Sequence, residues 1–262
     1  MSTARVIDLD LDLEPARPRV VAVILAYNVR PLLEKALRKI PRGLVDAVIV
    51  MDDGSTDGTA EEARRLGLTV FRNERNLGYG GNLRRGLERA VRDFGAEYVV
   101  EIHGDGAQFD PRAIATAVPL MNAGVPFIMG SRFVERGAAR RFGMPWVRLL
   151  ANRGLSALSR RVLALPLTEF HSGFRVYARS FVETLPLAAN ASNHLFSFQI
   201  LAQAAYFGQG VGEVPVDADY LSAHSSISLR AATRYAFATL ACMASYLLAK
   251  LGLRHTAVFP AR

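Results

Sequence analysis

The stretch DAVIVMDDGSTDGT, residues 46–59, decides the fold. Its first half, Asp46–Met51, is dominated by β-branched and apolar residues, a pattern typical of a strand buried on both faces of a parallel sheet. Its second half is a cluster of turn-forming and helix-capping residues that ends the strand and begins a helix at Thr59. A buried strand that leads through a polar loop into a helix is the repeating unit of an α/β protein.

The same unit recurs on both sides of this stretch. A buried strand is predicted at Arg19–Ala26, followed by a helix from Pro31 to Ile40. Further strands are predicted at 68–71, 97–102, 126–129, 174–177 and 211–216, and further helices at 59–66, 80–94, 111–121, 146–162, 196–206 and 229–251. We therefore expect an α/β fold, with a Rossmann-like, mostly parallel sheet flanked by helices in a single domain.

Composition limits the class of protein. The chain has 262 residues, of which 50% are apolar and 21% charged, so a disordered chain is excluded. The one cysteine, Cys242, excludes a disulfide framework and a four-cysteine zinc site. The net charge of +8 favours anionic partners. The apolar helical stretch 235–249 spans roughly 22 Å, too short for a ~30 Å hydrocarbon core, and the acidic N-terminal segment does not resemble a signal peptide.

Three polar loops directly follow three of the predicted strands. They are AYN (26–28), DDGST (52–56) and HGD (103–105). Ligands of open α/β sheets bind beyond the carboxyl ends of the strands. We therefore expect the three loops to meet at one ligand site.

Further motifs extend this pattern along most of the chain. They are VILAYN (23–28), VMDDGSTDGT (50–59), RNLGYGGNLRRGL (75–87), HGDGAQFDP (103–111), GSRF (130–133), HSGFRVY (171–177), GEVPV (212–216) and HSSIS (224–228). In this order they resemble the family 2 glycosyltransferases of the GT-A fold. HSGFR followed by EVPV resembles the branch that contains the dolichol- and polyprenyl-phosphate sugar synthases.

The resemblance implies a nucleotide-sugar donor, UDP- or GDP-linked. The donor-binding residues that it implies are Ala26, Tyr27, Asn28, Asp53, Gly78, Asp105, Ser225 and Ser226. Among them, Asp53 would accept the ring N–H that both uracil and guanine offer. Gly78 would allow the backbone to approach the nucleotide closely.

The donor's diphosphate gains negative charge as the sugar leaves, and a divalent cation, Mg²⁺ or Mn²⁺, can neutralise it. Asp105 is the principal candidate ligand, with Gln108 and His103 as further candidates. The family pattern is Asp-x-Asp with a glutamine two positions on. Here His103 replaces the first acid, and Gln108 stands one position late. Imidazole is a suitable ligand for Mn²⁺ but a poor one for Mg²⁺.

A lipid monophosphate acceptor requires cationic side chains, and the second half of the chain is rich in arginine. We predict that Arg132, Arg148 and Arg175 bind the acceptor, and that Asp105 and Arg132 are the catalytic residues. An ionised phosphate oxygen needs no strong general base. A hydroxyl acceptor would need one, and Glu169 and His171 are then the candidates.

The last predicted helix has an apolar stripe. Its members are Phe237, Leu240, Ala244, Leu247, Leu248 and Leu251. Core packing is the first expectation for such a stripe. The alternative is docking on a membrane surface, because Arg230, Arg234, Lys250 and Arg254 flank the stripe.

The sequence therefore predicts an N-terminal tail (1–18), a GT-A domain (19–228, with a donor half at 19–130 and an acceptor half at 131–228), and a C-terminal helix and tail (229–262). The predicted activity is metal-dependent transfer of a hexose from the nucleotide sugar to a polyprenyl phosphate. The reaction would invert the anomeric configuration, in the cytoplasm at the inner face of the membrane. The alternatives are transfer to a hydroxyl acceptor and a regulatory nucleotide-binding module without turnover. No base-reading motif supports a nucleic-acid partner.

Overall fold

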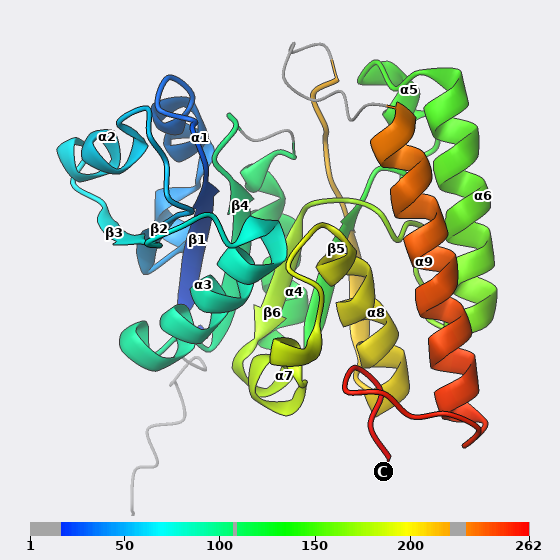
Figure 1. Cartoon of the computed structure of the whole chain (residues 1–262). Coiled ribbons are helices and arrows are strands. Elements are labelled where there is room, and N and C mark those ends of the chain that lie inside the picture. The colour runs from blue at the N-terminus through cyan, green and yellow to red at the C-terminus, as the bar shows by residue number, and fades with distance from the viewer. Residues whose placement is uncertain (1–16, 107–108, 221–228, 262) are drawn as a thin grey trace, which may run out of the picture.

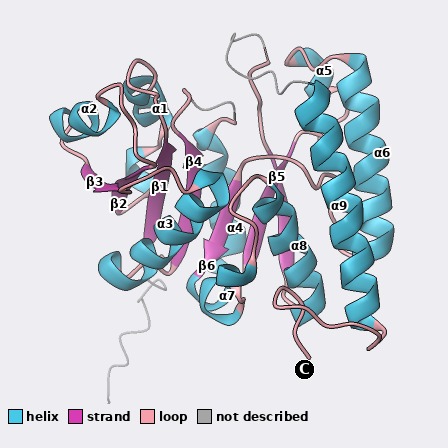
Figure 2. Ribbon diagram, in the orientation of Figure 1, coloured by secondary structure: helices cyan, strands magenta, loops and turns pink. Residues whose placement is uncertain are grey.

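The computed structural model describes residues 17–106, 109–220 and 229–261. In this part of the chain, seven strands form one sheet in the order β3-β2-β1-β4-β6-β5-β7. The strands are β1 (Val20–Ala26), β2 (Ala47–Asp52), β3 (Thr69–Arg72), β4 (Tyr98–His103), β5 (Phe127–Ser131), β6 (Arg175–Ala178) and β7 (Val211–Pro215). The mostly parallel α/β sheet expected from the sequence is confirmed (Figure 2).

The helices follow the predicted alternation closely. They are α1 (Leu33–Lys39), α2 (Thr59–Arg65), α3 (Gly78–Phe94), α4 (Ile114–Asn122), α5 (Ala138–Arg141), α6 (Trp146–Leu163), α7 (Arg179–Thr184), α8 (Leu195–Phe207) and α9 (Leu229–Lys250). The short helices α5 and α7 were not expected, because four to six residues carry too little periodicity to be recognised. Figure 1 shows α6 and α9 side by side at the end of the molecule opposite α2.

One strand breaks the parallel arrangement. β6 runs antiparallel to both of its neighbours, β4 and β5. It thereby carries Arg175 and Tyr177 into the centre of the sheet, opposite Glu101 and Val99 of β4. This junction joins the predicted donor half to the predicted acceptor half.

The core-packing expectation for the apolar stripe of α9 is wrong. Phe237 is 68% exposed and Leu251 is 70% exposed, whereas Met243 and Tyr246 are buried. The helix packs on α8 and α6 through the face that carries these two residues. The C-terminal tail closes the same contact, because the Tyr206 hydroxyl donates to the Pro260 carbonyl at 2.6 Å.

The contact between α3 and the sheet generates a stability prediction. A Cβ atom at Gly86 would lie 2.7 Å from Cγ1 of Val23 and 3.0 Å from Cγ of Met51. In the exposed part of α6, Gly154 has nothing within 4 Å of the same position. We expect Gly86→Ala to lower the free energy of unfolding by about 1–3 kcal/mol, because overpacking outweighs the gain in helix propensity.

Gly154→Ala is the matched control. It should raise the free energy of unfolding by up to about 1 kcal/mol, because only the propensity changes. Chemical denaturation of both variants measures the two effects. Equal stabilisation by both would show that α3 does not press on the sheet at Gly86.

Candidate functional site

The three polar loops meet at the carboxyl edge of the sheet. The backbone N–H of Asp53 donates to the Ala26 carbonyl at 2.9 Å, and that of Gly104 donates to the Leu25 carbonyl at 2.8 Å. Asn28 bridges the first two loops, because its side-chain oxygen accepts from the N–H of Thr56 at 2.9 Å. Asn28 has a φ of 52°, in the left-handed region that asparagine tolerates better than most residues. The edge is thus a pre-formed scaffold.

Asp53 is buried and ties the second loop to the start of α3. Its Oδ1 accepts from Nδ2 of Asn73 and from the backbone N–H of Leu77, both at 2.8 Å. Oδ2 makes none of the hydrogen bonds found in the described part of the chain, so one oxygen remains for a ligand. The neighbouring Asp52 is also buried, with Oδ2 3.3 Å from Nε of Arg72. Contact between Asp53 and a base stays a prediction.

The first loop presents Tyr27 to solvent. Its side chain is 50% exposed, whereas Ala26 before it is buried at the end of β1. An exposed aromatic ring offers a surface on which a planar base can stack, and the contact of Tyr27 and Ala26 with a nucleotide stays a prediction.

Gly78 lies against the backbone of Ser192, in the loop before α8. A Cβ atom there would lie 2.6 Å from the Ser192 carbonyl oxygen, and Gly78 has a φ of 77°. The N–H of Gly80 donates to the same carbonyl at 2.7 Å. The glycines of this segment therefore allow α3 to approach the loop before α8.

Asp105 fits a cation, whereas His103 is directed elsewhere. Oδ1 of Asp105 is buried and has no hydrogen-bond partner in the described residues. An unpaired buried carboxylate oxygen is costly unless a cation or donor satisfies it. Nε2 of His103 instead lies 3.1 Å from Oε1 of Glu101. Gln108 lies outside the described residues. Among the described residues, no group of three or more histidine, cysteine, aspartate or glutamate side chains could hold a metal ion.

Glu101 is the residue that sequence reasoning missed. It is 1% exposed, and its carboxylate accepts from the hydroxyls of Tyr79 and, at 2.7 Å, Tyr177. Nη1 of Arg175 lies 3.6 Å from Oε2 of Glu101. The available signal was a single acid inside an apolar strand, EYVVEI, two positions before His103.

The charges in this cluster stabilise one another. Burial alone would raise the pKa of Glu101, but the hydrogen bond from His103 and the charge of Arg175 lower it to about 2. Burial would lower the pKa of His103, but the Glu101 hydrogen bond and charge raise it above its usual value. The contacts of Arg175 are therefore with buried protein groups, Glu101 and Tyr79. Its contact with a phosphate stays a prediction.

Arg132 and Glu169 form a second buried pair. The backbone N–H and Nε of Arg132 donate to Oε2 of Glu169 at 2.8 and 3.0 Å, and Nη2 contacts Oε1. Arg132 is 2% exposed, and Nη1 contacts the hydroxyl of Tyr220. The glutamate thus accepts on both oxygens.

Arg148 is half-buried beside this pair. Its guanidinium lies 5.1 Å from the centre of the Tyr220 ring, and it forms no ion pair within the described ranges. Burial lowers its pKa. A half-buried cation without a carboxylate is a site that an anion would stabilise.

His171 is half-buried and contacts Tyr235 of α9. Its Nδ1 is 3.2 Å from the Tyr235 hydroxyl, and its Nε2 has no partner among the described side chains. Burial, with the charges of Arg132 and Arg175, lowers its pKa to about 3, so the ring is neutral at physiological pH.

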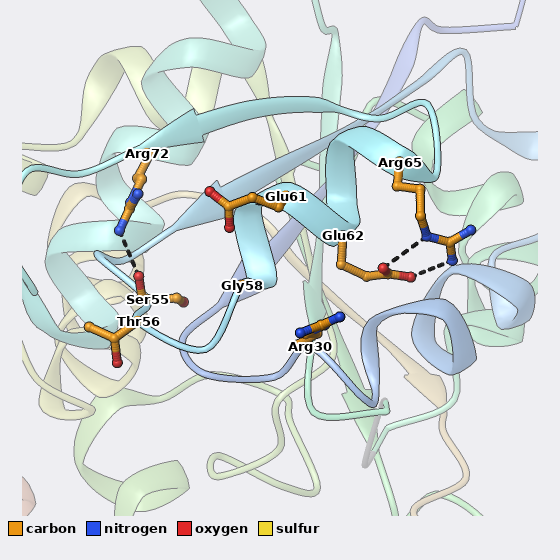
Figure 3. Close-up of a pocket in the computed structure, with 8 residues that line it drawn as sticks. All are labelled: Arg30, Ser55, Thr56, Gly58, Glu61, Glu62, Arg65 and Arg72. Atoms are coloured by element: carbon orange, nitrogen blue, oxygen red, sulfur yellow. Dashed lines mark hydrogen bonds and ion pairs between the residues drawn. The ribbon is translucent and has the colours of Figure 1, made fainter.

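The described part of the chain has two cavities of about 500 Å³, on opposite sides of the site. Figure 3 shows the first, on the α2 side of the second loop, where Arg72 donates to the Ser55 carbonyl at 2.7 Å and Arg30 lies below Gly58. Neither Asp53 nor Asp105 lines it. The second lies between the starts of α8 and α9, and His194, Arg230, Arg234 and Tyr235 line it.

The second cavity adjoins the Glu101 cluster. The His194 ring stacks on Tyr79 at 4.8 Å, and Tyr79 stacks on His103 at 5.8 Å. The cavity therefore begins one aromatic ring away from the loop that carries Asp105. Ser225 and Ser226, predicted to close over the donor, lie outside the described residues.

The fold is that of an open α/β protein with polar loops gathered at the carboxyl edge of its sheet, and comparison with known proteins identifies its class. Residues 21–185 match the family described as glycosyl transferase family 2. The chain belongs to this family and is a glycosyltransferase.

Similar proteins include two that carry a lipid phosphate in their names. Polyprenol monophosphomannose synthase of Mycolicibacterium smegmatis is 28% identical over 206 residues, covering 76% of both chains. UDP-N-acetylglucosamine--dolichyl-phosphate N-acetylglucosaminyltransferase of Methanococcus voltae is 26% identical over 219 residues, covering 77% of this chain and 86% of its own.

Solved structures show the same fold. Glucosyl-3-phosphoglycerate synthase of Mycobacterium tuberculosis with UDP superposes with a TM-score of 0.66 at 22% identity, covering 91% of this chain and 82% of that one. The same protein with Mn²⁺, UDP-glucose and glycerol 3-phosphate gives a TM-score of 0.65 at 21% identity, with the same coverage. The expected GT-A fold is confirmed.

The geometry of Asp53 generates a prediction. Asp53→Ala removes Oδ2, the oxygen left for a ligand, so the ring N–H of the base would lose its predicted acceptor at a cost of about 1–3 kcal/mol. We expect weaker nucleotide affinity by roughly 5- to 150-fold, measured by calorimetry with UDP and GDP. The control is Asp93→Ala on the exposed side of α3. Unchanged affinity in Asp53→Ala would restrict Asp53 to a role in the turn.

Proposed function

We propose that this glycosyltransferase moves a hexose from a UDP- or GDP-linked donor to a polyprenyl-phosphate acceptor at a membrane surface. The observation that carries the proposal is the state of the two base candidates. Glu169 is held on both oxygens by Arg132, and the half-buried ring of His171 is a weak proton acceptor because burial and nearby arginine charges lower its pKa to about 3. A hydroxyl acceptor needs a free base, whereas an ionised phosphate does not. The names of the two curated relatives support the same acceptor class.

The acceptor phosphate is proposed to bind beside Arg148. This cation has no carboxylate partner in the described residues, and it lies on the same Tyr220 ring that Arg132 contacts. Arg132 would act through its Nη1, because its Nε and Nη2 are committed to Glu169. Arg230 and Arg234 add positive charge at the second cavity. Charge-assisted bonds from arginine are the expected means of holding a monophosphate.

The donor is proposed to bind across the three loops, with its base near Asp53 and its diphosphate near Asp105. A divalent cation is proposed at Asp105, whose unpaired Oδ1 fits one, and Gln108 stays a predicted ligand. Bound there, the cation would neutralise charge on the leaving diphosphate. Structures of the same fold have been solved with Mn²⁺ or Mg²⁺ and UDP.

His103 has a different proposed role from that of a metal ligand. Its Nε2 faces Glu101, and although burial opposes the charged form, the hydrogen bond and charge of Glu101 raise its pKa and favour a positively charged ring close to Asp105. That charge would stabilise the diphosphate directly. Direct attack of the acceptor oxygen on the anomeric carbon would invert the configuration.

The membrane location of the reaction is also part of the proposal. None of the described helices combines the length and the apolarity that a bilayer-spanning segment needs. Access to a polyprenyl phosphate at the inner face of the membrane would then depend on surface contact.

The metal proposal is tested at Asp105. We expect Asp105→Asn to lower kcat by at least about 100-fold with little change in thermal stability, because it removes the carboxylate proposed to hold the cation that neutralises the leaving diphosphate. Chelation of divalent ions should abolish wild-type activity. Asp110→Asn, which alters an acid paired with Arg112, is the nearby control. Full activity in chelator would contradict the metal-assisted mechanism.

The acceptor proposal is tested at Arg148. Arg148→Gln should lower kcat/KM for a short-chain polyprenyl phosphate by about 10- to 150-fold, through loss of a charge-assisted contact, while nucleotide affinity stays unchanged. Arg38→Gln, which changes an exposed arginine on α1 away from this cluster, is the control and should change kcat/KM much less.

The same assay separates the two acceptor classes. With a phosphate acceptor, Glu169→Gln and His171→Asn should retain most of the nucleotide affinity and should not abolish transfer. A free polyprenyl alcohol should be a poor substrate. Preference for the alcohol, together with an inactive Glu169→Gln or His171→Asn, would replace the lipid-phosphate proposal with transfer to a hydroxyl.

A further inference from the structure

Two neighbouring helices expose large apolar side chains. On α6, Trp146 is 62% exposed, Val147 79% and Leu150 66%. On α9 and the turn after it, Phe237 is 68% exposed, and Leu251 and Leu253 are each 70% exposed. α6 and α9 pack against each other and lie side by side at one end of the molecule, so both sets of exposed side chains belong to this helix pair (Figure 1). Large apolar side chains that gather on the exposed sides of neighbouring elements mark an interaction site.

The charged residues of these two helices are all positive. α6 contains four arginines, α9 contains two arginines and a lysine, and neither helix contains an aspartate or a glutamate. Arg140 of α5 lies 4.6 Å above the Trp146 ring, so an arginine accompanies the most exposed aromatic residue. Apolar side chains bordered by arginine and lysine, without acids, are typical of helices that lie in a membrane interface.

We propose that the outer face of α6 and α9 docks on an anionic lipid bilayer. Charge decides between this partner and a second copy of the chain. A symmetric pair would bring two cationic faces together, whereas anionic headgroups neutralise them. The helices would lie in the plane of the interface, and no described helix is suited to cross the bilayer.

Docking through α6 and α9 would place the site loops where they can reach a lipid substrate. Figure 1 shows the N-terminal ends of α6 and α9 at the same end of the molecule as the loops after β1 and β4. Trp146 and Phe237 lie towards those ends, and Arg230 and Arg234 line the cavity beside them. Docking would therefore place that cavity close to the headgroups. The docking proposal does not depend on the identity of the acceptor.

Vesicle sedimentation of the full chain tests the proposal without any polyprenyl phosphate. We expect the wild type to bind vesicles in which phosphatidylglycerol replaces a third of the phosphatidylcholine, to bind pure phosphatidylcholine much less, and to dissociate in high salt. Val147→Ser combined with Phe237→Ser should weaken binding by about tenfold or more, because two apolar side chains no longer insert.

Charge is tested separately. Arg153→Gln with Arg161→Gln should weaken binding by about fivefold for each arginine. The matched control, Arg38→Gln with Arg42→Gln on the other side of the molecule, removes the same charge and should change binding much less. Circular dichroism checks that each variant is folded.

Two outcomes would overturn the proposal. One is the absence of binding to anionic vesicles, or binding that neither face variant alters. The other is a stable dimer in light scattering that Val147→Ser with Phe237→Ser dissociates while vesicle binding stays absent, which would assign the face to self-association. Because these vesicles contain no acceptor, failure here would leave the proposed transfer reaction standing.

Discussion

The buried carboxylate of Glu101 is the constraint on which the arrangement of the site depends. An ionised acid inside a sheet is tolerated only when donors and opposite charges surround it, and here they come from three elements. Tyr79 reaches it from α3, Arg175 and Tyr177 from β6, and His103 from the end of β4. The antiparallel β6 is what brings Arg175 close enough. One charge thereby fixes the donor loops relative to the acceptor half.

A second buried pair performs a related task on the acceptor side. Arg132 follows β5 and Glu169 precedes β6, so their contact fixes the loops at the carboxyl end of one strand and the start of its neighbour. Arg148, which lies on the same Tyr220 ring, has no ion-pair partner among the residues that the structure describes. The protein thus separates arginines that hold the fold from arginines that remain available to an anion.

The sequence predicted the fold well because strands buried on both faces leave long apolar runs, and because polar loops mark their ends. It predicted the three loops of the site for the same reason. It did not predict the partners of Arg132 or Arg175, because the pairing of distant charges depends on the antiparallel placement of β6, which has no local signal. It also assigned the wrong face of α9 to the core, because both faces of that helix are rich in apolar residues and only packing shows that Tyr246 is buried and Phe237 is not.

These observations connect the departure from the Asp-x-Asp pattern to the Glu101 cluster. A second aspartate at position 103 would lie beside the carboxylate of Glu101, where His103 now lies at 3.1 Å, and like charges at that separation repel. The histidine supplies an opposite charge to Glu101 and leaves Asp105 as the acid of the loop. The histidine at position 103 therefore removes a repulsion that an Asp-x-Asp pattern would create beside this buried glutamate.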